Sequence, residues 1–172
     1  MASTTRVLLL SDTHGQVHPE IVKIAAKVDR VVHAGDIGDA TVLEALREGG
    51  RPLHAITGNN DVPGKWPTVD RCVLADLPQQ LKIDLPGGVL AVEHGHRANP
   101  VAQRHKILRD RYPDARAIVY GHSHRQLVDD AEMPWVVNPG AAGRSRTFGG
   151  AGCIVLTIVG GEWRLEALRF AL

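Results

Sequence analysis

One stretch near the N-terminus decides the fold of this chain: Val7-Leu8-Leu9-Leu10-Ser11-Asp12-Thr13-His14-Gly15. The continuous apolar run of residues 7–10 predicts a fully buried strand, which the polar turn after it ends. Asp12 and His14 lie two residues apart, so they share one side if strand geometry persists into the turn. In α/β proteins, ligands bind at the carboxyl ends of the strands. This stretch therefore predicts a polar binding site at that edge of a sheet.

The residues that follow alternate between helical and strand patterns. An apolar stripe with helical spacing over residues 20–28 predicts one helix. Asp39 is the expected N-cap of a second, short helix that Gly49-Gly50 closes. Strands are expected at residues 7–10, 30–33 and 53–57. This βαβαβ order predicts parallel strands joined by right-handed crossovers.

The second half of the chain is expected to be mostly β. Residues 62–80 contain three prolines and are expected to form an irregular loop or a cap over the site. Residues 81–85 and 89–93 predict a hairpin. Asn99-Pro100 predicts the N-cap and first residue of a helix that ends near Tyr112. Further strands are expected at residues 117–120, 135–137, 153–159 and 163–169. Two packed sheets flanked by helices follow from this pattern.

Composition narrows the class of protein. The chain has 172 residues, so a single domain over residues 1–172 is expected. A formal charge of +1 gives no broad basic face and does not favour nucleic-acid binding. Cys72 and Cys153 lack metal-site or disulfide spacing. With no signal-peptide pattern and no apolar run long enough to cross a bilayer, we expect a cytoplasmic protein without a membrane partner.

Polar clusters follow most of the predicted strands, and their side chains are metal donors. Carboxylates, imidazoles and an amide oxygen together suit borderline divalent ions. The carboxylate of Asp36 can bridge two ions with its two oxygens. Seven donors with one shared give four for each ion and leave positions open, which is typical of a catalytic site. The candidate metal ligands are Asp12, His14, Asp36, Asn59, His94, His122 and His124.

The order of these clusters resembles that of a known family. Asp-x-His, Gly-Asp, Gly-Asn-x-Asp, His-Gly-His and Gly-His-x-His occur in the order found in the calcineurin-like metallophosphoesterase superfamily. Asn138-Pro139-Gly140 before a final pair of strands is similar to the small bacterial and archaeal phosphodiesterase branch. The resemblance covers residues 7–170. It implies an α/β fold, a four-layer α-β-β-α sandwich with two mixed β-sheets.

The resemblance also implies how the donors divide between two divalent ions. Mn²⁺ is the common activator of the family, with Ni²⁺, Fe and Zn²⁺ as alternatives. The implied ligands of one ion are Asp12, His14, Asp36 and His124. The implied ligands of the other ion are Asp36, Asn59, His94 and His122.

Two such ions would activate a water as hydroxide and stabilise charge on a phosphoryl group, so we expect hydrolysis of a small phosphate ester, most simply a phosphodiester. Many superfamily members carry a histidine where this chain has Asn60, and it helps the leaving group depart. Asn60 is a candidate catalytic residue, because its amide can hydrogen-bond an oxygen, but it cannot deliver a proton. His96 and bulk water are the candidate replacements. Asp61 is expected to orient a ligand histidine.

Alternative functions use the same fold. A phosphomonoesterase of the protein phosphatase type is disfavoured because residues 35–39 lack the arginine that those enzymes carry after the aspartate. A non-catalytic scaffold is the second alternative, since a eukaryotic retromer subunit has this fold with degraded metal ligands. A nuclease would need a basic groove that the composition does not provide. Small members of the family often self-associate, so a homo-oligomer is a further expectation.

Overall fold

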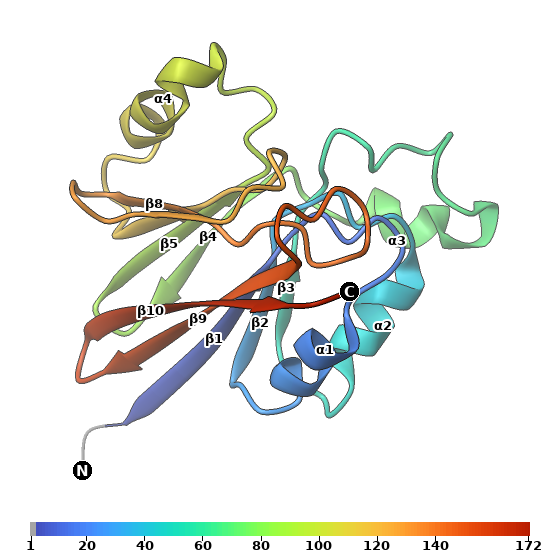
Figure 1. Cartoon of the computed structure of the whole chain (residues 1–172), viewed down its shortest axis with the longest axis horizontal. Coiled ribbons are helices and arrows are strands. Elements are labelled where there is room, and N and C mark those ends of the chain that lie inside the picture. The colour runs from blue at the N-terminus through green and yellow to red at the C-terminus, as the bar shows by residue number, and fades with distance from the viewer. Residues whose placement is uncertain (1–2) are drawn as a thin grey trace.

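The computed structural model describes residues 3–172, whose strands form two five-stranded sheets (Figure 1). In spatial order, the first sheet contains β10 (Glu162–Phe170), β9 (Ala151–Val159), β1 (Thr4–Leu10), β2 (Arg30–His33) and β3 (Leu53–Ala55). The second contains β4 (Gln80–Leu85), β5 (Gly88–Glu93), β6 (Ala117–Val119), β8 (Trp135–Asn138) and β7 (Leu127–Asp129). Each sheet mixes parallel and antiparallel pairs, as expected.

Strand β1 lies at the centre of the first sheet and is buried on both faces. Leu8 and Leu10 pack toward the helices on the outer face. Val7 and Leu9 point the other way, into the core shared with Leu90 and the rest of the second sheet. Because successive side chains point to opposite faces of a strand, a strand that is buried on both faces needs an uninterrupted run of apolar residues. The prediction of a fully buried strand is confirmed.

Helices cover the outer face of each sheet and complete four layers (Figure 1). Helices α1 (Pro19–Ala25) and α2 (Ala40–Arg47) pack on the first sheet through residues such as Ile21 and Leu43. Helix α4 (Arg104–Arg111) packs on the second through Leu108. The α-β-β-α sandwich implied by the resemblance is therefore present. Within residues 3–172, the helices are all too short or too polar to cross a membrane.

Two local expectations were wrong, and one strand was not predicted. Residues 62–80 are not irregular throughout, because a 3₁₀ turn (Thr68–Asp70) and helix α3 (Arg71–Ala75) bury Leu74 in the core. Asn99 does not cap a helix; its side-chain amide donates to the carbonyl of His96 at 2.8 Å. Strand β7 was missed, because only three residues pair with β8 and two of them are exposed.

Helix α2 begins at the predicted cap. Asp39 Oδ1 accepts hydrogen bonds from the backbone N–H groups of Thr41 at 3.0 Å and Val42 at 3.4 Å. Replacing Asp39 with Ala should lower the free energy of unfolding by about 1 kcal/mol, because these donors lose their acceptor. Asn at this position retains an acceptor and should cost much less. Urea denaturation of both variants measures the difference; equal losses would contradict a hydrogen-bonding role.

Candidate metal centre

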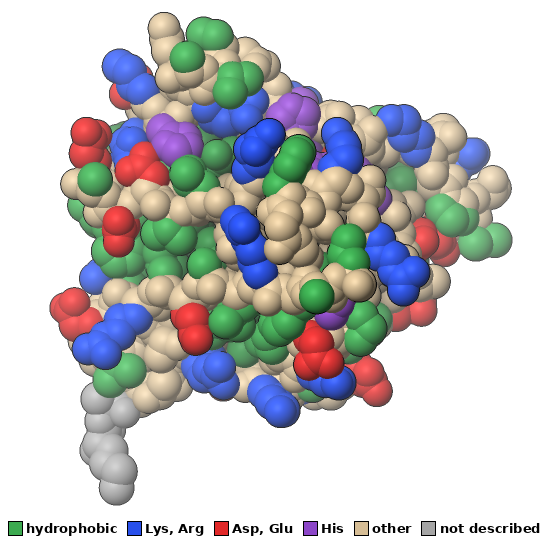
Figure 2. Space-filling view, in the orientation of Figure 1, with side chains coloured by type: hydrophobic (Ala, Val, Ile, Leu, Met, Phe, Trp, Pro, Cys, Tyr) green, Lys and Arg blue, Asp and Glu red, His purple; other side chains and the backbone are tan. Residues whose placement is uncertain are grey.

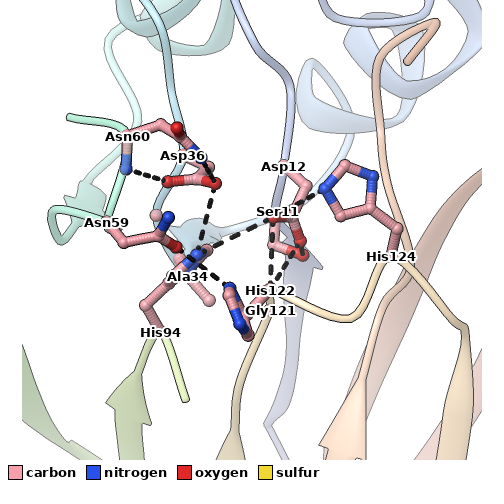
Figure 3. Close-up of polar contacts among 12 residues, drawn as sticks. Ser11, Asp12, Ala34, Asp36, Asn59, Asn60, His94, Gly121, His122 and His124 are labelled. Atoms are coloured by element: carbon pink, nitrogen blue, oxygen red, sulfur yellow. Dashed lines mark hydrogen bonds and ion pairs between the residues drawn. The ribbon is translucent and has the colours of Figure 1, made fainter. Parts of the chain in front are cut away.

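The strands of both sheets deliver the predicted ligands to one place (Figure 3). Asp12 follows β1, Asp36 follows β2 and Asn59 follows β3, and these three strands are parallel. His94 directly follows β5, and His122 follows β6, which runs parallel to β5. Because the parallel strands of each sheet end at the same edge, the five segments converge where the two edges meet.

Four of the candidate ligands form a compact set. One donor atom from each of Asp12, His14, Asp36 and His124 lies within 4.8 Å of the other three. The two Nε2 atoms of His14 and His124 are 3.1 Å apart, and His124 Nε2 is 3.4 Å from Asp12 Oδ1. His14 Nε2 is 3.8 Å from Asp36 Oδ2. This set is identical to the ligands that the resemblance implies for one ion.

Backbone carbonyls fix the orientation of two imidazole rings. Nδ1 of His124 donates to the carbonyl of Ser145 at 3.0 Å, and Nδ1 of His94 donates to the carbonyl of Ala34 at 2.8 Å. A carbonyl only accepts, so each Nδ1 carries a proton and each Nε2 is turned toward the carboxylates. His94 Nε2 is buried, has no hydrogen-bond partner among the described residues, and lies 3.4 Å from Asp36 Oδ2. A cation between these atoms would satisfy them all.

The remaining candidate ligands are more loosely arranged. His122 Nδ1 donates to Asn59 Oδ1 at 2.9 Å, so these two side chains contact each other. The rings of His94 and His122 meet edge to face with their centroids 5.4 Å apart. The donors that the resemblance assigns to a second ion are thus neighbours, and a second ion requires Asn59 and His122 to release each other.

The pKa values of the two carboxylates are displaced in opposite directions, although burial by itself raises both. It raises the pKa of Asp12 to about 7, an effect that His94 and the hydroxyl of Ser11 only partly offset. Burial would also raise the pKa of Asp36, but the nearby imidazole of His94 and the two hydrogen bonds from Asn60 outweigh it and hold this pKa below its ordinary value. Burial lowers the pKa of His122 to about 4. His122 is therefore neutral near pH 7 and can act as a metal ligand.

The backbone of the site adopts conformations that side chains rarely take. Within residues 3–172, six non-glycine residues have positive φ angles, between 49° and 67°. Five of them are candidate ligands, and the sixth is Arg146, whose Nη2 lies 3.1 Å from His124 Nε2. Strain of this kind persists where the surrounding structure imposes it, commonly at functional sites. The six are Asp12, His14, Asp36, His122, His124 and Arg146.

Asp61 has a different role from the one expected. It does not orient a histidine. Its carboxylate accepts hydrogen bonds from the backbone N–H groups of Ile37, Gly38 and Gly58 and from the indole of Trp66, at 2.8 to 3.1 Å. These donors belong to the loops after β2 and β3. Asp61 therefore holds together the two loops that carry Asp36 and Asn59.

Asn60 and His96, the residues considered for the leaving group, lie in different surroundings. The backbone and side-chain N–H groups of Asn60 donate to Asp36 Oδ1 and Oδ2, at 2.8 and 2.6 Å. His96 lies on the side of His94, with 5.6 Å between ring centroids, and lines a cavity of about 270 Å³ with Arg97.

Sequence reasoning missed Ser11 and Lys65. The Ser11 hydroxyl donates to Asp12 Oδ2 at 2.7 Å, and Lys65 Nζ donates to Asn60 Oδ1. Ser11 adjoins Asp12 in the sequence and could have been found from that position. No sequence pattern pointed to Lys65, because its contact with Asn60 depends on the path of the turn that carries it.

A family model described as the calcineurin-like phosphoesterase superfamily domain matches residues 5–161, so this chain belongs to that superfamily. A probable metallophosphoesterase of Methanocaldococcus jannaschii is 23% identical over 147 residues, covering 82% of this chain and 70% of the relative. A phosphodiesterase of the same archaeon is 23% identical over 151 residues, covering 78% of this chain and 82% of the relative.

Solved structures share the fold. Vps29 from Entamoeba histolytica, as a single mutant, superposes with a TM-score of 0.72 at 19% identity, over 96% of this chain and 99% of that one. The matched family makes this chain a phosphoesterase-superfamily protein with a candidate divalent-metal site. The structural similarity by itself establishes the fold and no more.

Gly58 should be intolerant of a side chain. A Cβ atom there would lie 2.1 Å from Asp36 Oδ1 and 2.4 Å from the Asp36 amide nitrogen. Gly58→Ala should therefore displace Asp36, lower the free energy of unfolding by about 1–3 kcal/mol and weaken Mn²⁺ binding at least ~10-fold. Gly64→Ala is the matched control, since a Cβ there meets nothing within 4 Å. Calorimetric Mn²⁺ titration of the folded variants measures the effect; equal affinities would contradict it.

Metal binding should strengthen as pH rises from 6 to 8. Burial holds the pKa of Asp12 at about 7, and the neighbouring carboxylates raise that of His94, so both are largely protonated at pH 6. A cation must displace these protons. Calorimetry in buffers of different ionisation enthalpy should show release of between about one and two protons at pH 6 and fewer at pH 8.5. A pH-independent affinity without proton release would be incompatible with this site.

Proposed function

We propose that this protein is a phosphodiesterase that hydrolyses a small organic phosphate with two divalent ions, Mn²⁺ being the first candidate. The observation that carries the proposal is the set of two carboxylates and two imidazoles with donor atoms within 4.8 Å of one another. The relative described as a phosphodiesterase supports the type of ester. The superfamily supports hydrolysis of phosphoester bonds.

The residues fit a pair of ions. Asp12, His14, Asp36 and His124 would hold one, and Asp36, Asn59, His94 and His122 would hold the other. A cation would satisfy two groups of the site. One is Nε2 of His94, which has no hydrogen-bond partner among the described residues, and the other is the buried carboxyl of Asp12, whose pKa is raised. When bound, such ions supply Lewis-acid chemistry, which acidifies water and neutralises phosphoryl charge.

The protein's own contribution is to hold these donors still. The hydroxyl of Ser11 and the backbone N–H of His122 fix Asp12, at 2.7 and 3.0 Å, while Asn60 fixes Asp36 through two hydrogen bonds. Cavities of about 270 and 460 Å³ open on the two sides of the donors. Cavities of this size suit small molecules. On the face shown in Figure 2, basic side chains are dispersed among acidic and neutral ones, as in a protein without a nucleic-acid groove.

The direct test is hydrolysis of bis(4-nitrophenyl) phosphate with Mn²⁺, beside 4-nitrophenyl phosphate as the monoester. Wild-type protein should bind metal and prefer the diester. Asp36→Asn should lower kcat at least ~100-fold, because it removes the shared charge that holds the ions. Asp84→Asn is the control, since this exposed residue lies near the β4–β5 turn, at the end of the hairpin opposite His94.

The outcomes separate the alternatives. Preference for the monoester would favour a phosphomonoesterase. Failure to bind any divalent ion, together with no hydrolysis of either ester, would favour a non-catalytic scaffold, the class suggested by the similarity in fold to Vps29. A small phosphate ester as partner, self-association and a cytoplasmic location remain part of the proposal.

A further inference from the structure

A lysine side chain contacts Asn60, the residue at which the resemblance implies a histidine in many superfamily members. Lys65 Nζ donates to the side-chain oxygen of Asn60. On its other side, the Asn60 amide donates to Asp36 Oδ2 at 2.6 Å. The ammonium group is therefore one side chain away from the carboxylate at the centre of the candidate metal site (Figure 3 shows Asn60 against Asp36).

The orientation of the Asn60 amide requires that the group in contact with its oxygen be a hydrogen-bond donor. An amide side chain has an NH₂ group at one end and an oxygen at the other. Asp36 can only accept, so it orients the NH₂ group inward and the oxygen outward. An outward oxygen requires a donor, and Lys65 supplies one. A carboxylate or an unprotonated imidazole nitrogen could not make the same contact.

The turn that carries Lys65 is anchored on both sides. The backbone N–H groups of Lys65 and Trp66 donate to the carbonyl of Val62 at 2.9 and 3.2 Å. Trp66 is only 3% exposed, and its indole N–H donates to the buried carboxylate of Asp61 at 2.9 Å. Asp61 in turn binds the loops that carry the candidate ligands. The backbone of Lys65 is thus fixed relative to Asp36, while its side chain stays accessible.

Lys65 and Asn60 line one cavity of about 460 Å³, together with His14 and Arg146. Asp39 is the acidic side chain in this cavity, and it caps helix α2. His96 belongs instead to the cavity on the side of His94. A substrate arm that leaves the metal site past Asn60 therefore meets Lys65 and not His96.

We propose that Lys65 is a catalytic residue that protonates the leaving-group oxygen, the task that Asn60 cannot perform. This inference rests on the proposed phosphodiesterase function. A water first gives one proton to solvent; a lone pair of the resulting hydroxide forms the new O–P bond, and the electron pair of the breaking P–O bond goes to the leaving oxygen. That oxygen takes a proton from Lys65 Nζ and departs as an alcohol. The resulting neutral amine regains a proton from solvent.

The dependence of rate on the leaving group tests this assignment. Methyl aryl phosphodiesters with leaving groups from 4-nitrophenol to phenol give a series of rising basicity. Lys65→Met should change kcat on the 4-nitrophenyl ester less than about threefold, because that leaving group needs little protonation. It should lower kcat on the phenyl ester by about 100-fold. Lys65→Arg, which keeps the charge but is a much weaker acid, should not restore the phenyl ester.

Two comparisons make the result decisive. Lys27→Met, at an exposed lysine just after helix α1, should match wild type across the series. An unchanged slope in Lys65→Met, or a slope that steepens in His96→Gln alone, would overturn the proposal. So would full restoration by Lys65→Arg, which would assign Lys65 a purely electrostatic role.

A measurement that does not depend on turnover separates this inference from the proposed function. Reductive methylation followed by mass spectrometry reports the accessibility of each lysine. A non-hydrolysable phosphonate monoester with an alkyl arm should protect Lys65 at least ~5-fold and leave Lys27 unprotected, as expected for a group held against the ester oxygen. Absence of all ester hydrolysis with every divalent ion would refute the proposed function. Hydrolysis without protection of Lys65 would refute the contact proposed here.

Discussion

The structure depends on two buried carboxylates held close together. Asp12 and Asp36 are 0% and 1% exposed and lie at the meeting point of the two sheets. Burying one unpaired carboxylate is already costly, and a second like charge nearby adds to the cost. The two pKa values are displaced in opposite directions as a result. Asp36 accepts hydrogen bonds and stays charged, while Asp12 has a raised pKa and is easier to protonate. A divalent cation between them is the simplest arrangement in which both are charged and satisfied.

The scaffold makes this arrangement possible through long-range contacts. Asp61 illustrates the principle, because one carboxylate binds backbone N–H groups from the loops after β2 and β3 and the indole of Trp66. Similarly, the side chain of Asn138 donates to the carbonyl of Gly121 at 2.7 Å, next to His122. Asp61 and Asn138 are both buried. They fix the loops that present the donors, and such support determines whether a metal site is accurate enough for catalysis.

Sequence patterns predicted the parts of the fold that have a local cause. The two-sided burial of β1, the cap at Asp39 and the β4–β5 hairpin follow from apolar runs and turn residues, and the structure contains all three. The gathering of Asp12, His14, Asp36 and His124 followed from their places after strands, although their roles as ligands stay predictions. Asp61 was given the wrong role and Lys65 was given none, because the partners of both residues are set by how separate loops pack. Helix α3 was not predicted, because the prolines around it interrupt the helical pattern.

Asn60 shows how the residue type at one position of a site limits what its neighbours can be. A histidine at that position could use one ring nitrogen toward a carboxylate and the other toward substrate. An amide with its NH₂ group held by Asp36 offers only an oxygen to the cavity, which attracts cations and donors. Lys65 contacts that oxygen from a turn whose buried anchors are Asp61 and Trp66, and Asp61 also binds the loops that carry the candidate ligands Asp36 and Asn59. The outward oxygen of Asn60 and the ammonium group that contacts it are therefore two parts of one hydrogen-bonded chain that ends at Asp36, and the role we propose for Lys65 depends on that chain.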